Sequence, residues 1–142
     1  MFEMITEAKT DKLPDVLAFL EKTLEERDCA PKTSIQLAVA LEEMFVNIAN
    51  YAYEGSSLPE SEKTARIVIE DCTVNDSPAV RITLYDKGMK YDPLAKEDPD
   101  TTLSADERDI GGLGIYMVKK SMDTVSYRRD GDLNVFAMEK AL

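Results

Sequence analysis

The stretch LEEMFVNIANYAY, residues 41–53, combines apolar and polar residues at the spacing of a helix. A helical wheel with about 100° per residue gathers its apolar members into one stripe that we expect to be buried. That stripe consists of Leu41, Phe45, Ile48 and Ala52. Glu43, Asn47 and Asn50 fall on the opposite side, and Glu42 is expected to point toward the flank of the stripe. The sequence therefore predicts an amphipathic helix with one polar face.

Glu43 and Asn47 are one turn apart, so their side chains are neighbours on that polar face. An amide oxygen can ligate a hard cation such as Mg²⁺. The neighbouring carboxylate can then accept a proton from an attacking hydroxyl. Taken alone, however, the pair is better explained as the solvated face of an ordinary amphipathic helix.

Working outward from this helix, hydrophobic periodicity and turn residues divide the rest of the chain into elements. Pro31 opens the helix, which reaches about Tyr53, and an earlier helix runs over about 14–27 with Thr10 or Asp11 as its cap. The other predicted elements are strands at 2–5, 66–74, 80–85, 125–129 and 133–139, and a helix at 114–122. Helices and antiparallel strands are segregated, which predicts an α+β two-layer sandwich with helices over one face of the sheet. We expect a single domain spanning residues 1–142.

The second informative stretch is DKGMKYDP, residues 86–93, directly after a predicted strand. The Asp86 carboxylate could accept a hydrogen bond from the exocyclic amine of adenine, and Gly88 would let the backbone approach the ring. A solvated Asp-Gly turn is the common alternative. The loop from 87 to 111 is long for a compact domain, which favours either a lid or a disordered segment.

The third stretch is GGLGI, residues 111–115, at the start of a predicted helix. Glycines expose backbone N–H groups and a helix N-terminus favours anions, so a phosphate group fits there. The stretch matches neither a Walker loop nor a dinucleotide fingerprint. A flexible hinge before a helix is the alternative.

Composition narrows the function classes. The formal net charge is −11 and no stretch concentrates Lys and Arg, so nucleic acid is not expected as a partner. There is no histidine, which removes any phosphoaccepting histidine. No signal peptide or membrane span is evident, and Cys29 and Cys72 are expected to be buried thiols, which together favour the cytoplasm.

The three stretches, in this order, resemble the N, G1 and G2 boxes of the GHKL ATPases, the group that contains gyrase B, Hsp90, MutL and the histidine kinases. Within that group the chain is similar to the anti-sigma-factor serine/threonine kinases of the RsbW and SpoIIAB type. The resemblance covers essentially the whole chain and implies the Bergerat-type ATP-binding fold, with a mixed, mostly antiparallel sheet. One departure is Tyr51, where many relatives have histidine.

The resemblance also implies roles for individual residues. Glu43 matches the catalytic base, Asn47 the Mg²⁺ ligand and Asp86 the adenine contact. The further residues expected to bind ATP are Asn50, Gly88, Tyr91, Arg108, Gly111, Gly112, Leu113 and Gly114. The loop 87–110 would be an ATP lid.

Two functions remain open at this stage. The first is a kinase that phosphorylates a serine or threonine of an anti-anti-sigma protein with a STAS fold and that also sequesters a sigma factor. The second is a binding module for which ATP is a structural ligand with little turnover. The resemblance further implies a homodimer, through the apolar part of the first strand and the first helix.

Overall fold

The computed structural model describes residues 1–95 and 112–142 of the chain. Its helices are α1 (Leu13–Leu24), α2 (Pro31–Asn47) and α3 (Gly112–Ser121), with short 3-10 turns η1 (Thr10–Lys12) and η3 (Glu60–Glu62) and a π-helical turn η2 (Ile48–Ala52). Its strands are β1 (Phe2–Glu7), β2 (Thr64–Val74), β3 (Ser77–Asp86), β4 (Thr124–Asp130) and β5 (Leu133–Ala141).

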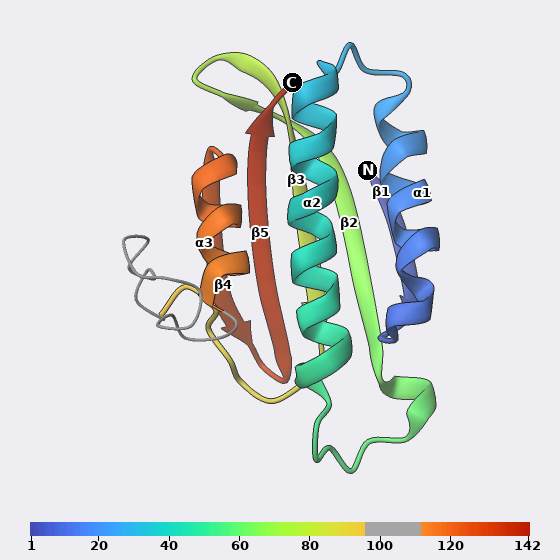
Figure 1. The fold of residues 1–142 in the computed structure, drawn as a ribbon. Coiled ribbons are helices and arrows are strands. Elements are labelled where there is room, and N and C mark those ends of the chain that lie inside the picture. The colour runs from blue at the N-terminus through green and yellow to red at the C-terminus, as the bar shows by residue number, and fades with distance from the viewer. Residues whose placement is uncertain (96–111) are drawn as a thin grey trace.

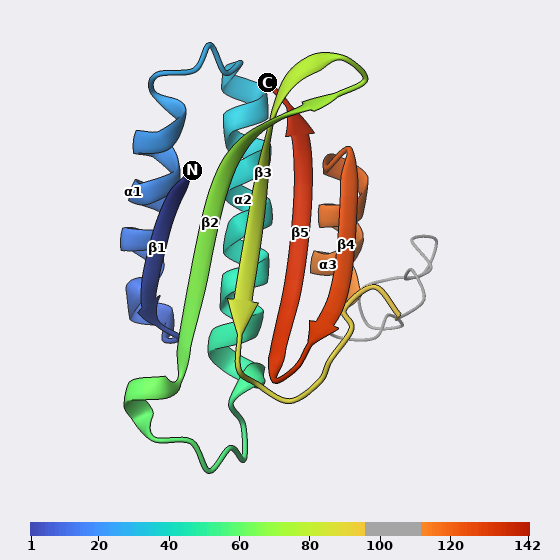
Figure 2. The same cartoon turned by 180° about the vertical axis from the view of Figure 1, so that it is seen from behind.

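The strands form one sheet in the order β1-β2-β3-β5-β4, and each neighbouring pair is antiparallel. Figure 1 shows the three helices in a layer over one face of this sheet, with α2 between α1 and α3. Figure 2 shows the opposite face, which these helices leave uncovered. The predicted two-layer α+β sandwich is therefore confirmed. The sheet was expected to be mixed, but every pair among the described strands is antiparallel.

The core lies between the sheet and α2. Helix α2 contributes five buried side chains, Leu37, Ala40, Leu41, Met44 and Phe45, and Ile48 of η2 adds another. Alternate residues of the central strands point toward it, among them Ile67, Ile69, Ile82, Leu84 and Met138. Burying one side chain of this size stabilises the fold by about 1.5–3 kcal/mol relative to leaving it exposed. Leu41, Phe45 and Ile48 of the predicted stripe are thus buried in the core, as are side chains of α1 and α3.

Two local predictions about the helices are wrong. The second helix does not continue regularly to Tyr53: α2 ends at Asn47 and the chain winds on as the π-turn η2. The expected side-chain cap of the first helix is also absent, because Thr10 and Asp11 belong to η1, which runs directly into α1. Lys12 occupies the N-cap position and makes no side-chain cap hydrogen bond.

Both cysteines are free thiols, as expected, but they are half-buried rather than buried. Partial burial raises the pKa of the Cys29 and Cys72 thiols, since it disfavours the thiolate. Among the described residues, no helix is both long enough and apolar enough to cross a bilayer.

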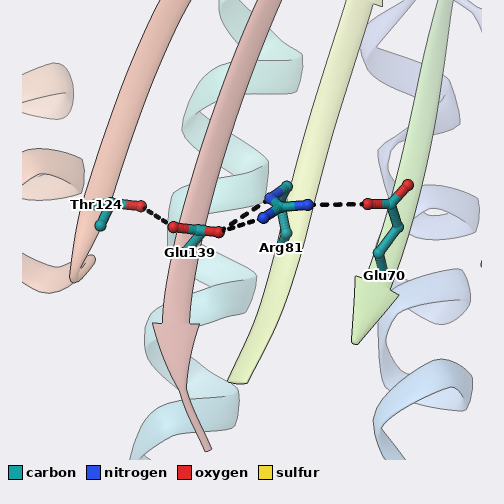
Figure 3. Close-up of polar contacts among 4 residues, drawn as sticks. All are labelled: Glu70, Arg81, Thr124 and Glu139. Atoms are coloured by element: carbon teal, nitrogen blue, oxygen red, sulfur yellow. Dashed lines mark hydrogen bonds and ion pairs between the residues drawn. The ribbon is translucent and has the colours of Figure 1, made fainter. Parts of the chain in front are cut away.

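The uncovered face of the sheet carries a polar ladder that links four strands (Figure 3). Arg81 on β3 bonds Glu70 of β2 through Nη1 at 3.1 Å and Glu139 of β5 through Nη2 at 2.8 Å. Thr124 of β4 donates to the other oxygen of Glu139 at 2.6 Å. The hydrogen bond from Thr124, followed by that from Arg81, holds the pKa of Glu139 below its usual range, although burial opposes the shift.

Replacing Arg81 with methionine is expected to lower the free energy of unfolding by about 0.5–1 kcal/mol at neutral pH, the scale of partly exposed ion pairs. The depressed pKa of Glu139 means that its contribution is present above its unfolded pKa, about 4.3, and is lost as the pH falls through the folded pKa. The difference between wild type and Arg81→Met should therefore shrink in acid. Urea unfolding at pH 7 and at about pH 3.5 measures it. Lys22→Met on α1 is the control. If Arg81→Met lowers the free energy of unfolding by the same amount at both pH values, the ladder does not have this role.

Candidate functional site

A cavity of about 370 Å³ lies between the C-terminal end of α2 and the sheet. The end of β3 and the start of β5 lie at the same end of the molecule, the lower end in Figure 1. The cavity is lined by Met44, Asn47, Ile48, Tyr51, Ala52, Glu54, Leu84, Asp86, Met89, Tyr91, Pro93, Tyr127, Asn134 and Phe136. Three of the residues predicted to bind ATP, Asn47, Asp86 and Tyr91, thus line one cavity, although Asn47 is far from the other two in the sequence.

The acidic residues Glu54 and Asp86 both line this cavity. Glu54 is exposed, whereas Asp86 is buried. It is the last residue of β3, and the two-residue period of a strand turns its side chain to the same side as the core residue Leu84. Its Oδ1 accepts hydrogen bonds from the amide of Gly88 at 2.9 Å and from Nδ2 of Asn134 at 3.0 Å. Burial raises the pKa of Asp86, an effect that these two hydrogen bonds and the charge of Arg129 oppose.

The loop after Asp86 is fastened to the turn that follows α2. The Met89 amide donates to the carbonyl of Ala52 at 3.1 Å, and the Lys87 amide donates to the Tyr53 hydroxyl at 2.9 Å. Gly88 packs so closely against Ala52 that a Cβ atom built on it would lie well inside 3.0 Å of the Ala52 carbonyl, which Cβ atoms do not tolerate. The glycine is required here because two backbone segments touch.

Replacing Gly88 with alanine is therefore expected to lower the free energy of unfolding by about 1–3 kcal/mol, the usual cost of forcing atoms into a packed site. It should also weaken the bond between the Met89 amide and Ala52, which hydrogen exchange reports. The control is Gly131→Ala in the β4–β5 turn, where φ is +60° and no atom lies within 4 Å of the added Cβ. The control should lose some stability through backbone strain while the Met89 amide stays protected. Full protection of that amide in Gly88→Ala would contradict the close contact.

Asn134 is a site residue that the sequence analysis missed. It is 7% exposed and lies directly opposite Asp86 in the pairing of β5 with β3. Besides its bond to Asp86, Nδ2 donates to the carbonyl of Met89 at 2.8 Å, and Oδ1 accepts from the Tyr127 hydroxyl at 2.7 Å. One signal could have found it: Asn134 has the same strand parity as the predicted strand's apolar Phe136 and Met138, which marks a polar residue facing the core.

The π-turn η2 carries the chain from the end of α2 along the cavity, and Ile48, Tyr51 and Ala52 line it. A π-turn advances each residue through a smaller angle than an α-helix, so it rotates residues 48–52 away from the positions of a regular helical wheel. Tyr51 lines the cavity although 62% of its surface is exposed. Asn50, expected on the same face as Glu43, is exposed and does not line the cavity.

Glu43 lies next to the start of α3 rather than in the cavity wall. A Cβ atom built on Gly114 would overlap the Glu43 carboxylate, so the two residues are in contact across the α2–α3 interface. Glu43 is half-buried, whereas Glu42 is exposed. The structure therefore joins the first and third motifs of the sequence, Glu43 with Gly114, at a point one helical turn from Asn47.

Several predicted residues lie outside the part of the chain that the structure describes. Arg108, Gly111 and most of the expected lid fall within residues 96–111. Gly112 and Leu113 form the first turn of α3, but only their place in the helix is described. Their roles remain predictions. Among the described residues, no three His, Cys, Asp or Glu side chains gather in a group that could hold a metal ion.

Comparison with protein families adds independent information. Residues 6–140 match the model of the histidine kinase-like ATPase domain. The chain is similar to the serine-protein kinase RsbW of Bacillus pumilus (strain SAFR-032), with 32% identity over 111 residues. That match covers 75% of this chain and 64% of the kinase, so less than two thirds of the relative's length is represented.

Among solved structures, the fold is similar to that of a chain in the SiaB–SiaC complex from Pseudomonas aeruginosa. The TM-score is 0.59, and the match covers all of this chain and 90% of the other. Sequence identity is 14%, so this likeness concerns the fold alone.

Proposed function

Because the chain belongs to the histidine kinase-like ATPase domain family, we propose that it is a protein serine/threonine kinase that binds ATP in the cavity at Asp86 and phosphorylates a partner protein. The observation that carries this proposal is the Asp86 carboxylate, buried at the end of β3 beside a glycine that leaves no room for a side chain. The similarity to the serine-protein kinase RsbW supports the protein-kinase activity.

The cavity suits an adenine base. Both described hydrogen bonds to the Asp86 carboxylate fall on Oδ1, so Oδ2 is left to accept from the exocyclic amine of adenine. Apolar side chains such as Met44, Ile48 and Leu84 can cover the faces of the ring. The volume of about 370 Å³ is within the range of small-molecule sites.

The phosphates would extend from the base toward the start of α3, past Asn47. Backbone N–H groups at a helix N-terminus and the glycines there suit a phosphate chain. Asn47 would supply one oxygen ligand to Mg²⁺, and the phosphates and water would supply the rest, as is usual for this ion. The bound ATP·Mg²⁺ supplies the phosphoryl group and neutralises part of its charge.

Glu43 would act as the general base. Its carboxylate lies against Gly114, next to the proposed position of the phosphates, and it is one helical turn from Asn47. A carboxylate there can accept the proton of a serine or threonine hydroxyl as the hydroxyl attacks the terminal phosphate. The substrate hydroxyl would be that of an anti-anti-sigma protein with a STAS fold, and a sigma factor would be the alternative partner in a partner-switching cycle.

The test is phosphotransfer. The protein is incubated with Mg²⁺, ATP labelled on its γ-phosphate and the STAS protein encoded nearest to it, and label on that protein is measured with time. Label on a serine or threonine that can be removed by mutating that residue supports the kinase. If wild type binds ATP and captures the STAS protein but transfers no label, the alternative holds, and the domain is an ATP-dependent binding module.

A further inference from the structure

The hydrogen bonds around Asn134 suggest more than a structural role. We propose that Asn134 is a positioning residue of the nucleotide site: it ties Asp86 and the loop after it to the β4–β5 hairpin and so keeps one oxygen of Asp86 turned toward the base. This proposal rests on the proposed function in one respect only, that the base binds at Asp86. The fixing of the loop is a property of the protein without nucleotide and can be measured separately.

The two ends of the Asn134 amide have distinct and consistent partners. Nδ2 donates to two acceptors, Oδ1 of Asp86 at 3.0 Å and the carbonyl of Met89 at 2.8 Å. Oδ1 accepts from three donors, the Tyr127 hydroxyl at 2.7 Å, Nη1 of Arg129 at 3.2 Å and the Tyr91 amide at 3.4 Å. Acceptors on one side and donors on the other fix the orientation of the amide, because the reverse orientation would place like groups together.

This arrangement controls which oxygen of Asp86 is free. Asn134 and the Gly88 amide both bind Oδ1, so the carboxylate cannot rotate without breaking two hydrogen bonds at once. Removing the donor from Asn134 leaves only the Gly88 amide, which moves with the loop itself. The carboxylate would then be oriented by one hydrogen bond in place of two, and its hydrogen bond to the base would weaken.

The β4–β5 hairpin also holds Asn134 and the loop after β3, through hydrogen bonds from Arg129. Arg129 on β4 donates from Nη1 to the carbonyl of Gly88 at 2.9 Å as well as to Asn134, and from Nε to the carbonyl of Gly131 at 3.0 Å. The loop after β3 is therefore held from two sides, by the turn after α2 and by this hairpin. Asn134 accepts hydrogen bonds from Tyr127 and Arg129 of the hairpin and donates one to Asp86, so it connects the hairpin to that carboxylate.

Two substitutions separate the effect of the hydrogen bonds that Asn134 donates from the effect of the space that its side chain fills. Asn134→Leu keeps the approximate size of the side chain and removes all its hydrogen bonds. Asn134→Asp keeps the acceptor for Tyr127 and Arg129 but replaces the donor by an oxygen facing Asp86. At about pH 8 both variants should bind ATP about 10- to 100-fold more weakly than wild type, the range expected for lost hydrogen bonds to a charged group.

Acid should rescue only Asn134→Asp. Its new carboxyl would face the Asp86 carboxylate, and two carboxylates in contact take up a proton more readily than either alone. The protonated carboxyl can donate to Asp86, as the amide does in wild type. Arg129 from β4 opposes this proton uptake, and the Tyr127 and Tyr53 hydroxyls are the other titratable groups facing the pair. Between about pH 8 and pH 5.5, the ratio of variant to wild-type Kd should therefore fall for Asn134→Asp and stay constant for Asn134→Leu.

The matched control is Thr83→Val. Thr83 is also 7% exposed, but it lies on β3 with the side-chain parity of the uncovered face and does not line the cavity. Calorimetric titration with ATP should give this variant the wild-type affinity at each pH. In the absence of nucleotide, hydrogen exchange of the amides of residues 88–91 should be faster in both Asn134 variants and unchanged in Thr83→Val.

Wild-type affinity and wild-type loop exchange in folded Asn134→Leu would overturn the proposal, and so would an Asn134→Asp defect that does not change with pH. If wild type itself binds no ATP, the proposed function fails. The exchange measurement then still decides whether Asn134 fixes the loop, with unchanged exchange overturning the proposal and faster exchange supporting it.

Discussion

Phosphoryl transfer to the partner protein is expected to fall about 10²–10⁴-fold when Glu43 is replaced by glutamine, the usual scale for losing a general base. Glutamine keeps the size of the side chain that lies against Gly114, so the α2–α3 contact should persist. ATP affinity should change little, because the cavity that would hold the base is lined by other residues. Single-turnover transfer of labelled phosphate, together with calorimetric titration of ATP, measures both quantities.

The adjacent Glu42 offers a matched control on the same helix. It is exposed, so Glu42→Gln removes the same charge one residue away without touching the site and should transfer phosphate at the wild-type rate. Asn47→Ala should differ from both, because losing a Mg²⁺ ligand weakens metal-dependent ATP binding as well as transfer. Transfer at the wild-type rate by Glu43→Gln would show that Glu43 is not the base.

Replacing Asp86 with asparagine is expected to lower ATP affinity about 100-fold while the protein stays folded. Asparagine can still accept from the Gly88 amide and from Asn134 through one oxygen. In place of Oδ2, however, it would present its amide NH₂ group to the exocyclic amine of adenine, so two donors would face each other. Calorimetric titration decides this, and unchanged affinity in the folded variant would contradict the assignment of Asp86.

The same substitution should leave stability unchanged or raise it at neutral pH. The pKa of Asp86 is raised by burial, so its ionised form is disfavoured in the folded protein. The sign follows from linkage: a carboxyl with a raised folded pKa contributes stability below its unfolded pKa, and that contribution is lost as the pH rises through the folded pKa. The stability of wild type relative to Asp86→Asn should therefore decrease from about pH 4 to pH 7, as thermal unfolding would show. A relative stability that increases with pH would mean that the charge is favoured in the folded site.

Much of the fold could be predicted from the sequence because it depends on local periodicity. The stripe of Leu41, Phe45 and Ile48 recurs at helical spacing and is buried against the sheet. The apolar residues of β2 and β3 alternate, which identified both strands and the hairpin between them. These patterns determine which face of an element is buried before any tertiary contact is known.

The predictions that failed depended on local geometry that periodicity does not report. The second helix was expected to run regularly to about Tyr53, and Asn50 was expected to bind ATP. Instead α2 ends at Asn47, the chain continues as the π-turn Ile48–Ala52, and Asn50 does not line the cavity. A helical wheel assumes one constant angle and cannot anticipate such a turn.

By itself, the sequence determined the layered α+β fold and the place of Asp86 at the end of a strand. It predicted that Gly88 lets the backbone approach an adenine ring, whereas the contact that excludes a side chain at Gly88 is with the Ala52 backbone. Only the tertiary structure decided which residues surround Asp86. Asn134 is 48 residues away in the chain and reaches the carboxylate because β5 pairs with β3 in one particular register. Glu43 likewise reaches Gly114 because α3 packs beside α2. The physical reason is that strand register and helix packing are set by the burial of the whole core, and no short stretch of sequence contains that information.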